Sequence, residues 1–201
     1  SFYPVDEFNS TSSNTVDMNL RLNTGLSIDV VKALVRKHRE GIPAHLTTED
    51  PDDILKEPSI DVVVETMGGI EPATAFMLQA MENGKHVVTA NKAAVAANYE
   101  KLQAAAAKNQ VQFLFEASVG GGIPVLTAIQ NALQGNAFLE VMGIVNGTTN
   151  YILTKMTEDG ADYAEVLKDA QAKGFAEADP TADVEGIDVA NKLSILIALL
   201  F

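Results

Sequence analysis

The chain has 201 residues, 47% of them hydrophobic, and a formal net charge of −13 at pH 7. This apolar content is enough for a folded core, and the acidic balance argues against nucleic acid or an anionic membrane as a partner. The sequence contains no cysteine, which excludes disulfides, thiolate metal sites and reaction through a cysteine nucleophile.

The N-terminal end shows no charged segment followed by an apolar one, so it does not resemble a secretion signal. No apolar run reaches the ~18–20 residues that a membrane-spanning helix needs. Residues 1–17 are polar and turn-rich, and they show neither helical nor strand period. We expect a cytoplasmic protein in which residues 1–17 form a loop or a disordered end.

Two elements are expected before the most regular part of the sequence. Residues 27–35 are rich in β-branched side chains and predict a strand, which ends in a basic run at residues 36–39. Residues 47–51, TTEDP, are a helix N-terminus signal and predict a short helix through Leu55.

Strand and helix patterns then alternate. The predicted strands span residues 60–65, 85–89 and 112–116, and the predicted helices between them span residues 71–83 and 92–108. Short connections of this kind predict right-handed βαβ units in a parallel, Rossmann-like sheet. Ligands of such sheets bind beyond the carboxyl ends of the strands. Those ends carry Arg36, Gly68-Gly69, Asn91-Lys92 and Glu116.

The pattern changes after Glu116. A glycine-rich turn at residues 119–124 fits a domain crossover, and we place the boundary near Ala117, which gives domains of residues 1–116 and 117–201. The second domain is expected to be α+β. Its predicted elements are a helix at 124–134, a strand at 139–145, a helix that begins at Tyr151 after a cap within 146–150, and a helix at 161–173.

The stretch from Gly174 to Leu200 sets an acidic loop before an apolar helix. Asp188 and Lys192 are four residues apart and therefore share a helix face. One interpretation is an exposed ion pair of roughly 0.3–0.5 kcal/mol. The other is that the helix is buried because it is apolar all round, which would put both charges at the border of a cavity.

The two ends of the sequence predict a fragment of a longer protein. A complete dinucleotide-binding fold begins with a strand and a G-x-G-x-x-G turn, and no such turn precedes Ser27. The sequence also stops at Phe201 inside an apolar helix pattern, without a stop signal.

Five motifs, in this order and at this spacing, resemble those of homoserine dehydrogenases. They are D-V-V-V-E-T-M-G-G at 61–69, V-T-A-N-K-A at 88–93, E-A-S-V-G-G-G-I-P at 116–124, G-I-V-N-G-T-T-N-Y-I-L at 143–153 and G-F-A-E-A-D-P-T-A-D-V-E-G-I-D-V-A-N-K at 174–192. The resemblance extends from about residue 20 to Phe201. It implies interconversion of L-homoserine and L-aspartate 4-semialdehyde with NAD(P), in the pathway to threonine, methionine and isoleucine.

The resemblance also implies roles for single residues. Lys192 would be the catalytic acid and base, and Lys92 a second lysine between cofactor and substrate. The residues implied to hold homoserine are Glu177 and Asp188, supported by Asp183 and Asp179. Gly68 would lie beside the cofactor. A monovalent cation such as sodium would be bound mainly by backbone carbonyls, those of Glu116, Val119, Gly121 and Ile123. The sheet of the second domain would form the interface of a homodimer or higher homo-oligomer.

Elementary chemistry agrees with these roles. Hydride transfer to an aldehyde needs a proton donor at the nascent alkoxide, and an enclosed Lys192 ammonium would serve both as donor and as electrostatic stabiliser. The ammonium of homoserine suits carboxylates such as Glu177 and Asp188. Arg36 and its basic neighbours follow the strand at which such folds distinguish the cofactor ribose. Basic residues at this position, without an acidic residue beside them, predict NADP as the cofactor, with NAD as the alternative.

Other interpretations remain open at this point. The acidic loop could bind a divalent cation, although its spacing does not fit the D-x-D-x-D-G pattern. The glycines at 120–122 could serve only as a hinge. The whole chain could be a non-catalytic folding or dimerisation module, or another βαβ reductase that acts on a small amino-acid-like substrate.

Overall fold

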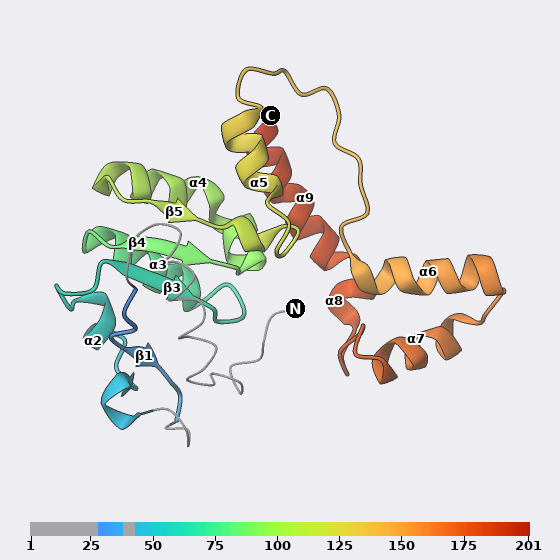
Figure 1. Cartoon of the computed structure of the whole chain (residues 1–201), viewed down its shortest axis with the longest axis horizontal. Coiled ribbons are helices and arrows are strands. Elements are labelled where there is room, and N and C mark those ends of the chain that lie inside the picture. Colours follow the sequence, from blue (N-terminus) through green and yellow to red (C-terminus); the bar gives the residue numbers. More distant parts are fainter. Residues whose placement is uncertain (1–27, 38–42) are drawn as a thin grey trace.

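The structure is a computed structural model, and it describes residues 28–37 and 43–201. A parallel three-stranded sheet forms the centre of its N-terminal part (Figure 1). The strands β3 (Val62–Glu65), β4 (His86–Thr89) and β5 (Phe113–Leu114) lie in the order β3-β4-β5. This arrangement confirms the predicted α/β class and its βαβ units.

Two helices connect these strands and pack against each other. They are α3 (Ala73–Glu82) and α4 (Lys92–Asn109). Gly84 follows the end of α3 with a φ of +75°, a left-handed conformation that glycine adopts without strain. The side chain of Asn91 accepts a hydrogen bond from the Ala94 amide and so caps the start of α4.

The predicted strand at residues 27–35 is wrong in extent. Ser27 lies outside the described residues, and β1 spans only Ala33–Leu34. Its one partner in the described chain is β2 (Thr47–Thr48), which offers two residues for pairing. Extended backbone becomes a strand only where it finds a hydrogen-bonding partner.

The segment that was predicted to open a helix at residues 47–51 instead begins with β2. A 3₁₀ turn at Ala44–Leu46 precedes this strand. The helix α2 starts later and spans Asp52–Leu55. Its end at Leu55 agrees with the prediction, and the buried Leu55 side chain joins the main core.

The C-terminal part is helical within the described residues. After a 3₁₀ turn at Glu116–Ser118, the helix α5 (Val125–Thr127) continues as a π-helical segment, η4 (Ala128–Ala132). The remaining helices are α6 (Gly147–Asp159), α7 (Tyr163–Ala172), α8 (Thr181–Val184) and α9 (Ile187–Leu200). The predicted helices at 124–134 and 161–173 are therefore present, and the one predicted from Tyr151 begins four residues earlier.

The predicted strand at residues 139–145 is absent. This segment pairs with no other strand among the described residues. Three of its apolar side chains, Leu139, Met142 and Ile144, are 93%, 85% and 79% exposed. The residues have strand propensity, but propensity without a pairing partner does not make a sheet.

One core joins the sheet to the last helix. Val87 of β4, Phe113 of β5 and Leu102 of α4 belong to the same buried cluster as Ile195 and Leu196 of α9. Each fully buried aliphatic side chain of this kind stabilises the fold by about 1.5–3 kcal/mol. A smaller second cluster holds α6 and α7 together. Figure 1 shows α9 running between the sheet and the lobe formed by α6 and α7.

The expectation that α9 is buried all round is wrong. Ile195 and Leu196 are buried, whereas Leu193 and Ile197 on another face are exposed. The hydrophobic sequence of α9 shows how much surface the helix could bury. In the described residues α9 packs mainly against α4, with further contacts to α8 and η4, and the face with Leu193 and Ile197 stays exposed. No helix in residues 28–37 and 43–201 combines the length and the hydropathy required to cross a membrane.

Candidate functional site

Asp188 lies at the start of α9 and contacts two lysine side chains. It follows Gly186, whose φ of +74° turns the chain sharply into the helix. Lys92 Nζ lies 2.9 Å from Asp188 Oδ1, and Lys192 Nζ lies 2.6 Å from Oδ2. Asp188 is only 4% exposed, so this buried carboxylate holds two cations at once.

The two lysines reach Asp188 from different parts of the fold. Lys92 is the first residue of α4 and follows β4 at the carboxyl-end edge of the sheet. Lys192 lies one helical turn after Asp188 in α9, as the spacing predicts. The contact therefore joins the edge where parallel sheets bind ligands to the helix that carries the acidic loop.

Lys192 is mostly enclosed, with 17% of its side chain exposed. Besides Asp188, its Nζ donates a 2.6 Å hydrogen bond to the Val145 carbonyl. Both partners accept hydrogen bonds from Nζ and so fix its position. An ammonium group has three N–H donors, so within the described residues one donor of Lys192 remains for a substrate oxygen.

Asn146 connects Asp188 to a second carboxylate. Its amide Nδ2 donates to Asp183 Oδ1 at 2.7 Å and to Asp188 Oδ2 at 2.9 Å. Its Oδ1 accepts from the Thr149 amide at 2.8 Å, which caps α6. Thr148 Oγ1 lies 2.9 Å from Asp183 Oδ2. Asp188 is therefore held by a neutral donor as well as by two cations, whereas the Asp183 carboxylate accepts from the neutral side chains of Asn146 and Thr148.

The surroundings of Asp188 act on its pKa in opposite directions. Burial alone would raise the pKa, because it disfavours the charged form. Hydrogen bonds from Asn146, Lys192 and Lys92, together with the charge of Lys92, outweigh burial and lower the pKa of Asp188 below its ordinary value. Asp188 is therefore a permanent anion at neutral pH.

These groups line one open cavity of about 660 Å³. Part of its wall is aromatic, since the rings of Tyr151 and Phe175 pack with their centroids 4.9 Å apart. The charged side chains that line the cavity are Lys92, Asp183, Asp188 and Lys192. The volume and the mixture of charged and apolar walls suit a small polar ligand.

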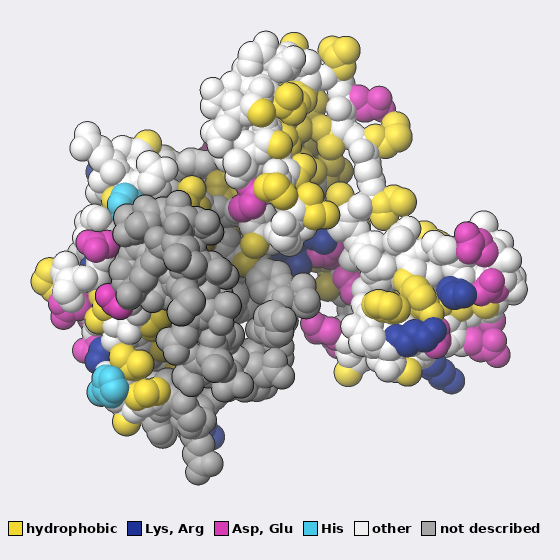
Figure 2. All heavy atoms as spheres, in the orientation of Figure 1, with side chains coloured by type: hydrophobic (Ala, Val, Ile, Leu, Met, Phe, Trp, Pro, Cys, Tyr) yellow, Lys and Arg dark blue, Asp and Glu magenta, His cyan; other side chains and the backbone are white. Residues whose placement is uncertain are grey.

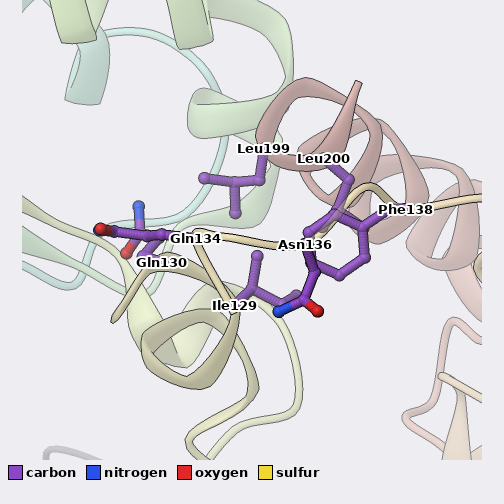
Figure 3. A pocket seen from close by; sticks show the side chains of 7 residues that line it. All are labelled: Ile129, Gln130, Gln134, Asn136, Phe138, Leu199 and Leu200. Carbon is purple, nitrogen blue, oxygen red and sulfur yellow. The ribbon is translucent and has the colours of Figure 1, made fainter. Parts of the chain in front are cut away.

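A second hollow, of about 450 Å³, lies between η4 and the end of α9 (Figure 3). Its lining residues are Ile129, Gln130, Gln134, Asn136, Phe138, Leu199 and Leu200. These are apolar or amide side chains, and none of them is a general acid, a general base or a nucleophile. The cavity around Asp188 is therefore the candidate functional site.

The loop after β3 is held by buried polar side chains. Glu65, 5% exposed, accepts the Met67 amide and the Thr89 hydroxyl, both at 2.5 Å. Asn91 Nδ2 donates to the carbonyls of Met67 at 3.3 Å and Gly69 at 2.7 Å. Gly68 therefore sits in a fixed loop. Apart from its two chain neighbours, no atom of the described residues lies within 4 Å of the position that a Cβ would take. A ligand can approach its backbone closely.

Replacing Asn91 with alanine is expected to lower the free energy of unfolding by about 2 kcal/mol. The change removes the α4 cap and the donor to the Met67 and Gly69 carbonyls. Urea titration of the two proteins measures the difference. Asn136→Ala is the control, because Asn136 is exposed and, among the described residues, its side chain bonds only to the nearby Leu133 carbonyl. Equal stability of the Asn91 variant and the parent would contradict this account of the loop.

Comparison with known proteins identifies the family. A family model described as the homoserine dehydrogenase NAD-binding domain matches residues 13–116, and one described as homoserine dehydrogenase matches residues 124–201. The chain belongs to the homoserine dehydrogenase family. The resemblance found in the five motifs is thereby confirmed.

Individual homoserine dehydrogenases agree closely over this region. That of Synechocystis is 47% identical over 85% of this chain and 40% of its own length, and that of Bacillus subtilis is 46% identical over 86% and 40%. The structure of the Thiobacillus denitrificans enzyme is 44% identical, with a TM-score of 0.87 over 96% of this chain and 45% of that one. The chain thus spans less than half the length of these relatives.

A hyperthermophilic archaeal homoserine dehydrogenase has been solved in complex with NADPH. It is 30% identical to this chain, with a TM-score of 0.70 over 76% of this chain and 47% of that one. Together with the NAD-binding domain match, it supports a nicotinamide cofactor for this family.

The site residues predicted from the sequence and the family resemblance fall into two groups. Lys92, Asp183, Asp188 and Lys192 come together around one cavity. Glu177 and Asp179 do not line it. Glu177 is exposed, and Asp179 instead accepts the Thr181 amide and hydroxyl at 3.1 and 2.6 Å. The role of Glu177 in substrate binding stays a prediction.

Arg36 lies exposed just after β1, and Arg39 lies outside the described residues.

The Glu116 carboxylate accepts the amides of Leu126 and Thr127 at 2.9 and 2.7 Å and the Thr127 hydroxyl at 2.6 Å. It is therefore engaged at the start of α5. In the described residues, no cluster of three or more His, Asp and Glu side chains is arranged to hold a metal ion.

The uncharged groups of the site were not predicted from the sequence. The Asn146 region was predicted as a helix cap, and no role was predicted for the Val145 carbonyl or for Thr148. A signal was present, because Asn91 and Asn146 both stand between an apolar segment and a helix. Such an asparagine can cap with its oxygen and still donate two hydrogen bonds elsewhere.

Proposed function

We propose that the protein is an oxidoreductase that interconverts L-homoserine and L-aspartate 4-semialdehyde with NADPH, in the pathway to threonine, methionine and isoleucine. Its family membership supports this proposal, and the observation that carries it is the contact of Lys92 and Lys192 with the buried Asp188. That contact joins the ligand-binding edge of the sheet to the start of α9.

The residues provide proton transfer and charge stabilisation. The nicotinamide donates or accepts the hydride when it is bound. Lys192, as an ammonium, donates a proton to the alkoxide that forms when the aldehyde is reduced, and it takes the proton back in the reverse direction. Asp188 keeps Lys192 oriented through the 2.6 Å contact. Lys92 adds positive charge on the sheet side of the cavity.

The carboxylates suit the ammonium group of homoserine. Asp188 already accepts hydrogen bonds from Lys92, Lys192 and Asn146, and a carboxylate has about four acceptor positions. Asp183 keeps more of its acceptor capacity and lines the same cavity. We propose that Asp183 and Asp188 face the substrate ammonium, with Glu177 joining them from the acidic loop.

The strand ends fit a dinucleotide. Gly68 offers a backbone without an obstructing side chain, and Arg36 lies exposed after β1, the position that accommodates a 2′-phosphate in such folds. We therefore propose NADP as the preferred cofactor, with NAD as the weaker one. The relative solved with NADPH supports this choice.

Arg36→Ala is expected to lower kcat/KM for NADPH about tenfold, because one charge-assisted phosphate contact is lost. The specificity constant for NADH should change less than about twofold, since NADH lacks the 2′-phosphate. Initial rates with both cofactors measure the two effects. A parent enzyme with the higher kcat/KM for NADH would contradict the NADP preference.

We also propose a monovalent cation such as sodium at the turn after β5. The proposed ligands are backbone carbonyls of Glu116, Val119, Gly121 and Ile123. In the described part of the chain, the Val119 and Gly121 carbonyls accept no hydrogen bond, whereas those of Glu116 and Ile123 accept the Val119 and Val125 amides. Two oxygens are thus available to a cation without loss of a structural contact.

A homodimer or higher homo-oligomer is the proposed assembly, in the cytoplasm where NADPH is regenerated. Its support is apolar surface on the C-terminal part. Figure 2 shows hydrophobic side chains gathered on the lobe that contains α5, α9 and the segment of residues 139–145. The exposed residues of that lobe include Leu139, Met142, Ile144, Leu193 and Ile197. Contiguous apolar surface of this kind marks an interaction site.

The test is the oxidation of NADPH by the intact protein with L-aspartate 4-semialdehyde, followed at 340 nm, and the reverse reaction with L-homoserine and NADP. We expect turnover in both directions. Turnover with another small carbonyl substrate but not with aspartate semialdehyde would favour a different reductase, and no turnover would favour a non-catalytic module.

A further inference from the structure

Asn146 occupies the centre of the polar cluster and is 5% exposed. The orientation of its amide is fixed from both ends. Oδ1 lies 2.8 Å from the Thr149 amide and 2.8 Å from the Thr149 hydroxyl, which are donors. Nδ2 faces Asp183 and Asp188, which are acceptors. A flipped amide would place oxygen against two carboxylates, so only one orientation is stable.

The backbone at this position reaches the same site. Val145, the residue before Asn146, supplies the carbonyl that accepts from Lys192 Nζ at 2.6 Å. Asn146 itself bonds to Asp188 Oδ2, the same oxygen that contacts Lys192. Two neighbouring residues at the start of α6 therefore hold both members of the Lys192–Asp188 pair.

We propose that Asn146 is a positioning residue for the proton-transfer lysine, an inference that rests on the proposed function. Its amide fixes the separation of Asp183 and Asp188, and through Asp188 it fixes the direction of the Lys192 ammonium. The substrate ammonium and the substrate hydroxyl are thereby held at a set distance from each other. Asn146 does not itself touch the reacting atoms.

No other side chain meets the same demands. Serine caps a helix but is too short to reach both carboxylates, and glutamine is too long for the cap geometry. Aspartate has the same shape and keeps the cap, but it replaces the donor with a third carboxylate. Asn146→Asp is therefore the sharpest test, because it changes charge and donor capacity with little change in volume.

We expect Asn146→Asp to lower kcat for homoserine oxidation about 100-fold, while KM for NADP changes less than about twofold. The ratio of variant to parent activity should rise as the pH falls from about 8 to about 6. The introduced carboxyl group faces Asp183 and Asp188 as well as Lys92 and Lys192, and crowding of three carboxyl groups favours uptake of a proton that restores a donor. A purely structural role would not produce this pH dependence.

Asn146→Ser separates capping from positioning. It keeps a good N-cap residue but removes the amide donor to Asp183 and Asp188, so the thermal unfolding temperature should fall only modestly, while kcat falls about tenfold without a change in the pH profile. The matched control is Asp162→Ser at the start of α7. Asp162 also caps a helix, by accepting from the Ala164 amide at 2.9 Å, but it lies outside the cavity. Its kcat should equal that of the parent.

The inference is overturned if Asn146→Asp has a kcat and a pH profile within about twofold of the parent. An inactive parent would tell against the proposed function instead. In that case a crystal structure of the Asn146→Ser variant tests the positioning role. A Lys192–Asp188 contact that opens or rotates supports this role, and an unchanged 2.6 Å contact refutes it.

Discussion

Lys192→Ala is expected to reduce kcat about 10³–10⁴-fold in both directions, with the fold intact. The change removes the proton donor and the positive charge that faces the developing alkoxide. It leaves Asp188 paired with Lys92, at 2.9 Å, so the cavity keeps one cation. Steady-state kinetics with homoserine and NADP give kcat, and circular dichroism with cofactor titration reports fold and binding.

The matched control is Lys155→Ala on α6. Lys155 forms the same type of i,i+4 ion pair, at 2.7 Å from Asp159, but on the exposed surface. Its kcat should change less than about twofold. Turnover of the Lys192 variant within about tenfold of the parent would remove Lys192 from the proton-transfer role.

Asp188→Asn is expected to lower the free energy of unfolding by about 2 kcal/mol near pH 7 and to reduce kcat about 100-fold. Asp188 is the only carboxylate in the described residues that contacts both Lys92 and Lys192. Asparagine keeps the shape but leaves two close ammonium groups without their anion. The stability cost is at the lower end for a buried pair, because the Lys92 side chain is partly exposed.

The stability effect of Asp188→Asn should depend on pH in a defined direction. The folded-state pKa of Asp188 is lowered from its ordinary value of 3.8. Its contribution is therefore fully present above that value and is lost as the pH falls through the lower folded pKa. The stability difference between parent and variant should be constant from about pH 8 to about pH 5 and shrink in stronger acid.

Urea titrations over this pH range measure the difference. Asp159→Asn is the control, since Asp159 pairs with Lys155 on the surface, and no comparable loss is expected there. A stability difference that grows in acid would mean that Asp188 does not fold as the anion of this cluster.

The sheet and the Asp188–Lys192 pair could be predicted because their signals are local. The apolar runs around β3 and β4 and the glycine that ends α3 each specify an element through nearby residues. The i,i+4 spacing of Asp188 and Lys192 likewise fixes a contact within one helix. Lys92 was assigned to the site only through the family resemblance, because it lies almost one hundred positions before Asp188 in the sequence.

The parts that could not be predicted depend on partners elsewhere in the chain. Residues 139–145 have the composition of a strand, yet a strand exists only beside another one. The exposure of Leu193 and Ile197 on α9 could not be predicted for the same reason, because burial of a helix face also depends on a partner elsewhere in the chain. The segment 146–150 was predicted to hold a helix cap, which is a local feature, whereas the bonds of Asn146 to Asp183 and Asp188 arise from tertiary packing.

The most direct test of the central claim is a crystal structure of the intact protein with NADP and homoserine. The account predicts the homoserine hydroxyl within about 3 Å of Lys192 Nζ, with the nicotinamide on the Lys92 side of the cavity. It also predicts that Asp188 still bridges the two lysines. Homoserine bound away from this cavity, or a Lys192 ammonium directed into bulk solvent, would contradict it.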